Sequence, residues 1–142
     1  MTIIIDTREQ IPFQFSIPSI RKTLKAGDYS VLGFEDKIAI ERKELGDLTN
    51  CVGKDRNRFI AQMKQLSFFH RKYLVIESSL PCILKGDFGY KKINPDSILG
   101  TICKIAIEYE IFPIFAGGHR AGGKITESLL VQYYKKYRKG AS

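Results

Sequence analysis

The sequence of 142 residues contains no apolar run that approaches the ~18 residues of a membrane span. Residues 1–6 lead directly into a strand-like segment, which is not the pattern of a signal peptide. Cysteine is scarce: Cys51, Cys82 and Cys103 are odd in number and widely spaced, so neither a disulfide framework nor a zinc site is expected. These features predict an intracellular protein, cytoplasmic or nucleoid-associated, with reduced thiols and no membrane partner.

Acidic residues are also in short supply. The chain has 15 aspartates and glutamates against 23 lysines and arginines, which gives a formal net charge of +8. Such an excess indicates a polyanionic partner, either nucleic acid or an anionic membrane surface. The hydrophobic fraction of 44% is ordinary for a globular protein. A chain of this length is expected to form one domain that buries roughly 68–70% of its unfolded surface.

The stretch from Ile38 to Asp47 begins as an alternating strand and ends in a cluster of charged residues. Because successive side chains of a strand point to opposite faces, Glu41 and Lys43 share one face and Arg42 lies on the other. A carboxylate and an ammonium then point into the same space, as a metal-dependent phosphodiesterase requires. The alternative is an ordinary surface strand, because Glu-x-Lys is a common sequence.

A second carboxylate is expected opposite Glu41. Residues 29–32 are strand-like, and the turn signal at residues 33–36 predicts a hairpin with the strand that follows. In this register Asp28 faces Glu41, with Cβ atoms roughly 4.5–5.5 Å apart. Two such carboxylates repel each other unless a cation or a proton separates them, so the pair favours a metal site.

The remaining pattern predicts an α/β fold with a central mixed sheet flanked by helices. Residues 2–6, 73–77 and 111–115 read as strands, the first closed by Asp6 and the last placed at an edge by Pro113. Apolar periodicity predicts helices over about 56–69, from Asn94 and Pro95 onward, and over about 125–136. Residues 81–93 read as a long loop, and residues 48–54 as a loop or short helical turn that Asp47 caps.

Several basic residues next to these elements are candidates for DNA contacts, with a solvated surface as the alternative. They are Arg56, Arg58, Lys91, Lys92 and Arg120. The glycine-rich segment 117–123 reads as a mobile connector, although its amides could cradle a phosphate. It lacks the strand–GxxxxGK[ST]–helix context of a P-loop, so no nucleotide cofactor is expected.

Four short elements, in order along the chain, resemble the signature of the XPF-type structure-specific DNA endonucleases. They are Asp6-Thr7-Arg8-Glu9, Gly27-Asp28, Glu41-Arg42-Lys43 and Asp47. Each element is common by itself, whereas the ordered combination is specific. The resemblance implies a restriction-endonuclease-like fold of the PD-(D/E)XK class. It also implies that residues 1–142 form a single nuclease domain, without a helix-hairpin-helix module, as in short stand-alone bacterial or phage-type members.

The resemblance also implies roles for individual residues. Asp28 and Glu41 would hold Mg²⁺ or Mn²⁺ together with the main-chain carbonyl of Arg42, Lys43 would orient or activate water, and Asp6 would complete the acidic site. The residues expected to support this arrangement are Arg8, Glu9, Arg42 and Asp47.

The expected function is metal-dependent hydrolysis of phosphodiester bonds in branched or otherwise structured DNA, during repair or recombination. A non-catalytic DNA-binding or scaffold subunit is the alternative from another class, and an RNA-directed nuclease is a third possibility. The apolar edge at residues 111–115, together with the habit of the resembled family, predicts a homodimer or a partner protein.

Overall fold

The computed structural model describes residues 1–88 and 92–140. Six strands form one mixed sheet in the order β2-β1-β3-β4-β5-β6. The strands are β1 (Ile3–Ile5), β2 (Ser19–Arg21), β3 (Tyr29–Val31), β4 (Ile38–Lys43), β5 (Arg71–Ile76) and β6 (Phe112–Phe115). Strand β3 runs antiparallel to both of its neighbours, and the other pairs are parallel. The predicted mixed sheet is therefore confirmed.

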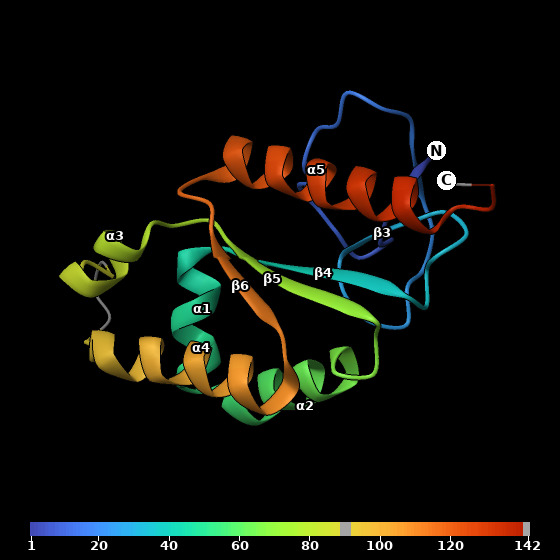
Figure 1. Cartoon of the computed structure of the whole chain (residues 1–142). Helices are drawn as coiled ribbons and strands as arrows, with labels where there is room; N and C mark the ends of the chain where they lie inside the picture. The colour runs from blue at the N-terminus through green and yellow to red at the C-terminus, as the bar shows by residue number, and fades with distance from the viewer. Residues whose placement is uncertain (89–91, 141–142) are drawn as a thin grey trace.

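Helices cover both faces of this sheet (Figure 1). On one face lie α1 (Leu45–Val52), α2 (Arg56–Leu66) and α4 (Pro95–Tyr109), with the short α3 (Leu80–Lys85) beside α4. The long α5 (His119–Tyr137) covers the other face. No helix of the described residues is long and apolar enough to cross a membrane.

Strand β4 separates two hydrophobic clusters through its alternating side chains. Ile38 and Ile40 pack toward α5, in a cluster with Phe13, Tyr29 and residues of α5. Ala39 packs into the other cluster, against the layer of α1, α2 and α4. The side chains of β4 thus alternate between the two faces, as the sequence predicts. This alternation assigns Glu41 and Lys43 to the face of α1, α2 and α4.

Several elements begin or end where the sequence predicts. The side chain of Asn94 accepts a hydrogen bond from the main-chain N–H of Asp96, and Pro95 opens α4. Strand β5 lies inside the sheet and β6 lies at its edge, as predicted. Asp55 precedes α2, but its side chain makes no capping hydrogen bond and forms an ion pair with Arg58 over 3.5 Å instead.

Three sequence-based expectations were wrong about helices. The helical alternative for residues 48–54 was right, but the helix spans residues 45–52, so Asp47 lies in its first turn and the predicted cap was wrong. Within the expected loop 81–93 the chain forms α3, capped by the Ser79 hydroxyl and ended by Gly86 in the left-handed conformation. The glycine-rich segment is not a connector, because α5 begins at His119 and contains both Gly122 and Gly123.

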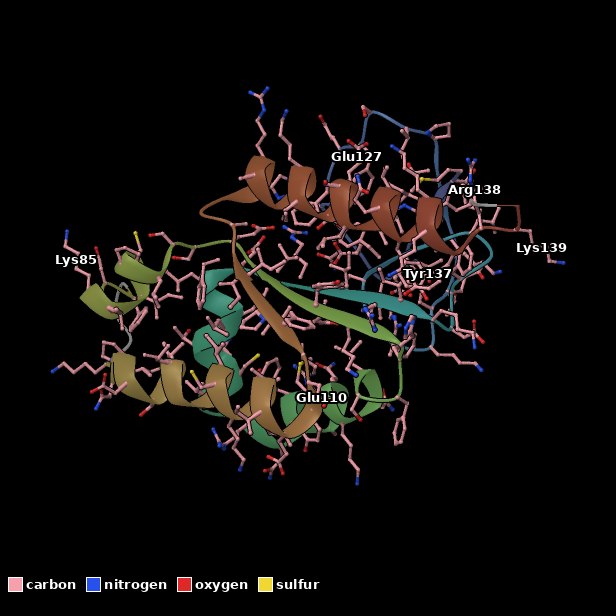
Figure 2. All side chains as sticks on the ribbon, in the orientation of Figure 1. Lys85, Glu110, Glu127, Tyr137, Arg138 and Lys139 are labelled. Carbon is pink, nitrogen blue, oxygen red and sulfur yellow. The ribbon has the colours of Figure 1, made fainter. Side chains whose placement is uncertain are left out.

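The N-terminal segment between β1 and β2 is fastened to α5. Glu127, labelled on α5 in Figure 2, accepts hydrogen bonds from the main-chain N–H groups of Ser16 and Ile17 over 2.7 and 3.2 Å. The ring of Phe13 lies where a Cβ on Gly122 would approach to 2.9 Å. The two glycines therefore allow the loop to pack directly on the helix.

Candidate active site

The hairpin of β3 and β4 has the register that the sequence predicts. Tyr29 pairs with Ile40, and the side chains of the next residues along the chain in each direction, Asp28 and Glu41, line the same hollow. The connection is longer than expected, because β3 ends at Val31. Gly27 adopts a φ of +81°, and a Cβ there would lie 3.1 Å from the Cβ of Ala39. Glycine is needed at that position for the chain to bring Asp28 against β4.

Asp28 and Glu41 both have a raised pKa in a poorly solvated site. Burial is the largest cause for both carboxyl groups. The negative charge of Asp28 raises the pKa of Glu41 further, and the negative charge of Glu9 raises the pKa of Asp28. The main-chain N–H of Arg42 donates to Asp28 Oδ2 over 2.8 Å and fixes its orientation. Such a pair favours a nearby cation.

Lys43 is the cation that the chain itself supplies. Its Nζ lies 3.6 Å from Glu41 Oε1 and 5.7 Å from the ring centroid of Phe59 on α2. Burial opposes its charge, but Glu41 and Asp28 are among the groups that raise its pKa above the ordinary value. The ammonium is therefore charged and held beside the two carboxylates.

Asp6 is present at the site but is already engaged. Its carboxylate accepts from the main-chain N–H of Leu24 over 2.9 Å and from Arg8 through Nε over 2.7 Å and the second guanidinium nitrogen over 3.1 Å. These bonds lower the pKa of Asp6, against the effect of burial. The geometry gives Asp6 the role of an anchor for the loop before Gly27 and for Arg8.

These side chains line one open hollow of about 260 Å³. Asp6, Arg8, Asp28, Glu41 and Lys43 all contribute to it. Its wall also contains Lys25, Gln62 and Gln65, which sequence reasoning missed. The two glutamines lie three residues apart on one face of α2, a spacing that gains meaning only when α2 is known to pack beside β4.

The side chain of Arg42 points to the opposite face of the sheet and is held by a polar network. Its guanidinium pairs with Glu77 at the end of β5, with Glu9 over 3.1 Å and with Glu44 over 2.9 Å. His119 Nδ1 lies 3.2 Å from both the guanidinium and Glu77. The ionic contacts keep the pKa of Arg42 above its ordinary value despite burial. The expected supporting role of Glu9 thus has a definite geometry.

An aromatic layer backs this network. The guanidinium of Arg42 lies 5.0 Å from the ring centroid of Phe13, which stacks on Tyr29 at 5.1 Å. The Tyr29 hydroxyl donates to Glu9 over 2.6 Å and accepts from the main-chain N–H of Phe13 over 2.9 Å. Neither Tyr29 nor His119 was singled out from the sequence, because the contacts join segments far apart in the chain.

The other candidate residues do not gather at the hollow. Asp47 forms no ion pair within residues 1–88 and 92–140, and lines a neighbouring hollow with Arg42. Arg56 donates to the Thr101 hydroxyl of α4 over 3.0 Å. Arg58 is exposed and paired with Asp55, and Arg120 lies at the start of α5. Lys92 is exposed before α4, and Lys91 lies outside the described residues.

A hard divalent cation requires several oxygen donors that converge on one point. Within the described residues no three carboxylate, imidazole or thiol side chains form a group that could hold a metal. Two carboxylates do converge, and the third donor would come from the main chain. Ile40 O accepts from Asp28, whereas Lys43 O accepts from Glu77 on the other side of β4. Since strand carbonyls alternate, the Arg42 carbonyl points to the side of Asp28, and this all-oxygen set suits Mg²⁺ or Mn²⁺.

Comparisons with known proteins agree with this architecture. The chain is similar to the solved structure "XPF from Aeropyrum pernix", with a TM-score of 0.73 and 19% identity over 97% of this chain and 66% of that chain. It is also similar to "XPF from Aeropyrum pernix, complex with DNA", with a TM-score of 0.75 and 20% identity over 97% of this chain and 67% of the other.

At these identities the structural matches show a shared fold, and this chain spans about two thirds of the XPF chains. The comparison with curated proteins gave no match. Residues 5–129, which hold the whole candidate site, match the model of the family described as ERCC4 domain. The chain therefore belongs to the ERCC4 domain family.

Proposed function

We propose that this protein is a divalent-metal-dependent endonuclease that hydrolyses phosphodiester bonds in DNA, preferably branched or otherwise structured DNA. The observation that carries the proposal is the half-buried carboxylate of Asp28 and the buried carboxylate of Glu41, beside the Lys43 ammonium in one open hollow. An ordinary strand pair gains no stability from two facing carboxylates in a poorly solvated site. A site built to hold a cation requires them.

Each residue of the hollow has a proposed task. Asp28, Glu41 and the Arg42 carbonyl would hold Mg²⁺ or Mn²⁺, which would supply Lewis-acid polarisation of the phosphate and a more acidic water. Lys43 orients the attacking water and offsets the negative charge that develops on the phosphate. Asp6 and Arg8 keep the loop that carries Asp28 in place.

The identity of the substrate rests on charge and on relatives. The net charge of +8 favours a polyanion, and the fold is shared with an XPF protein whose structure was solved in complex with DNA. Lys25 and Arg8 add positive charge at the mouth of the hollow. DNA as the substrate places the proposed activity inside the cell, in the cytoplasm or at the nucleoid, in repair or recombination.

The test is a cleavage assay with labelled duplex, single-stranded, flap, fork and four-way DNA and with an RNA duplex, each with Mg²⁺, Mn²⁺, Ca²⁺ or EDTA. We expect cleavage of DNA with Mg²⁺ or Mn²⁺, and binding with poor turnover in Ca²⁺, whose longer bonds misplace the water. Undiminished cleavage in EDTA would refute the metal dependence. Binding of DNA without cleavage under every condition would instead support a scaffold subunit.

We also propose that a second copy of the chain packs on the edge strand β6. Phe112 is 59% exposed there, and Ile107 on the neighbouring α4 is 84% exposed. An apolar sheet edge of this kind is a hazard for aggregation unless it is covered. Light scattering at micromolar concentration is expected to give the mass of a dimer, and Phe112→Lys is expected to give the monomer.

A further inference from the structure

Three cationic residues from distant parts of the chain lie at the end of the sheet where β4 and β5 begin. Lys37 precedes β4, Arg71 opens β5, and Lys136 lies in the last turn of α5. The main-chain N–H of Arg71 donates to the carbonyl of Lys37 over 3.0 Å. The ring of His70 lies 5.1 Å from that of Tyr137, over which Lys136 Nζ sits at 5.4 Å. We call Lys37, Arg71 and Lys136 the far-end patch.

The charges of the far-end patch are not neutralised by the protein. None of its three residues forms an ion pair with a carboxylate of residues 1–88 or 92–140. Asp36 adjoins Lys37 in sequence and Glu110 lines a hollow with Arg71, but neither is paired with the patch. The pKa of His70 is lowered by desolvation and then by the charges of Arg71, Lys136, Lys37 and Lys72, in line with the positions of the three patch residues around His70.

The shape of the far-end patch suits an extended anion. Its cations come from three separate segments of the chain and lie across the surface, and Arg138 and Lys139 continue the positive charge just beyond α5 (Figure 2). A compact anion would require donors that converge in a cavity. A nucleic-acid duplex presents one phosphate charge per ~1.7 Å of its axis and matches a spread row of cations.

We propose that the far-end patch binds the phosphodiester backbone of a duplex arm of the substrate, at a place separate from the cleavage hollow. The inference rests on the proposed nuclease function. Lys37 of the far-end patch immediately precedes β4, and Lys43 at the hollow ends it, so the two sites lie on the order of 20 Å apart along the strand. The far-end patch would therefore hold DNA about half a helical turn or more from the cleaved bond.

The test compares two variants that lose the same charge. The patch variant is Lys37→Gln, Arg71→Gln and Lys136→Gln, and the control variant is Lys64→Gln, Lys85→Gln and Lys104→Gln, which removes exposed lysines from α2, α3 and α4. Fluorescence anisotropy measures binding of a labelled duplex of about 30 base pairs as salt is varied, in a Glu41→Gln background so that nothing is cleaved. Sedimentation and thermal melts check that all variants keep the fold and the oligomeric state of the parent.

We expect the patch variant to lose affinity at least about tenfold at moderate salt, and its plot of log affinity against log salt to be shallower by about 2–3. The control variant is expected to lose much less. Equal losses in the two variants, or an unchanged slope in the patch variant, would overturn the proposal. Wild-type binding to phosphatidylserine vesicles that competes with DNA and is lost in the patch variant would also overturn it, in favour of a membrane surface.

Kinetics separate this proposal from the proposed function. With Glu41 restored, the patch variant is expected to show a raised KM and an unchanged kcat, because its residues hold DNA and do not touch the reacting atoms. Lys43→Ala is expected to lose kcat instead. Absence of cleavage in the wild type, together with weaker DNA binding by the patch variant, would defeat the proposed function and leave the far-end patch supported.

Discussion

Replacing Asp28 with asparagine, or Glu41 with glutamine, is expected to stabilise the metal-free protein while abolishing cleavage. Burial, and then the charge of neighbouring carboxylates, raises the pKa of Asp28 from 3.8 to about 6. That difference corresponds to a penalty of roughly 3 kcal/mol for the ionised carboxylate in the folded state. Asparagine keeps an oxygen that can accept the main-chain N–H of Arg42, now 2.8 Å from Asp28 Oδ2.

The sign of the pH dependence follows from the direction of the shift. Because the folded protein favours protonated Asp28, the penalty is absent below the ordinary pKa of 3.8, grows as the pH rises, and is complete above about 6. The pKa of Glu41 is raised in the same direction, so its penalty extends to higher pH. Wild type and Asp28→Asn should therefore melt alike in acid and diverge toward neutral pH.

Thermal melts in EDTA at several pH values, repeated with Mg²⁺, measure this difference. A gain of about 3 kcal/mol would raise the Tm by up to roughly 10 °C for a domain of this size. Adding Mg²⁺ should raise the Tm of the wild type, since the metal binds only the folded state, and should leave Asp28→Asn unchanged. Glu108→Gln, which removes an exposed carboxylate on α4, is the control for loss of charge alone.

Three outcomes would refute this reasoning. Destabilisation of the metal-free protein by either substitution at neutral pH would show that the carboxylates do not repel each other. A difference in Tm that does not vary with pH would show that ionisation of Asp28 is not its cause. Cleavage close to that of the wild type would show that Asp28 and Glu41 are ordinary surface residues of a strand pair.

Three further substitutions test other parts of the structure. Lys43→Ala should abolish cleavage and leave Mn²⁺ affinity, measured by calorimetry, intact or improved, because it removes a positive charge beside Glu41; a large loss of affinity would contradict this. Gly122→Ala should lower the free energy of unfolding by about 1–3 kcal/mol through a clash with Phe13, whereas Gly100→Ala on α4, with nothing within 4 Å, should be neutral or stabilising in the same urea titration. Tyr29→Phe should cost about 1–3 kcal/mol in that titration, since the buried N–H of Phe13 loses its acceptor, and an unchanged midpoint would exclude this role.

The sequence alone predicted the structure correctly where that structure depends on a local pattern of residues. The alternation of apolar and polar residues in β4 specified which face carries Glu41 and which carries Arg42. The turn between the hairpin strands is longer than predicted, yet Tyr29 pairs with Ile40 as the predicted register requires, because the register depends on the sum of paired positions and not on the turn type. Asn94 and Pro95 likewise marked the start of α4 through a purely local hydrogen bond.

Prediction failed where distant segments decide the local structure. Gly122 and Gly123 have low helix propensity, and from the sequence they indicated a connector. In the folded chain they lie in α5, where the absence of side chains lets Phe13 pack against the helix. The contacts among Glu77, His119 and Arg42 join residues separated by 35 to 77 positions, so no local pattern could reveal them.

The two faces of β4 act together through the main chain of one residue. The side chain of Arg42 is fixed by Glu77, Glu9 and His119 on the face of α5, while its N–H donates to the Asp28 carboxylate on the other face. A shift of the guanidinium would therefore move the donor that orients Asp28. This explains why an arginine stands between a glutamate and a lysine that face the opposite side of the sheet: it ties the Asp28 carboxylate to the segment after β1, to the residue after β5 and to the start of α5 without entering the hollow.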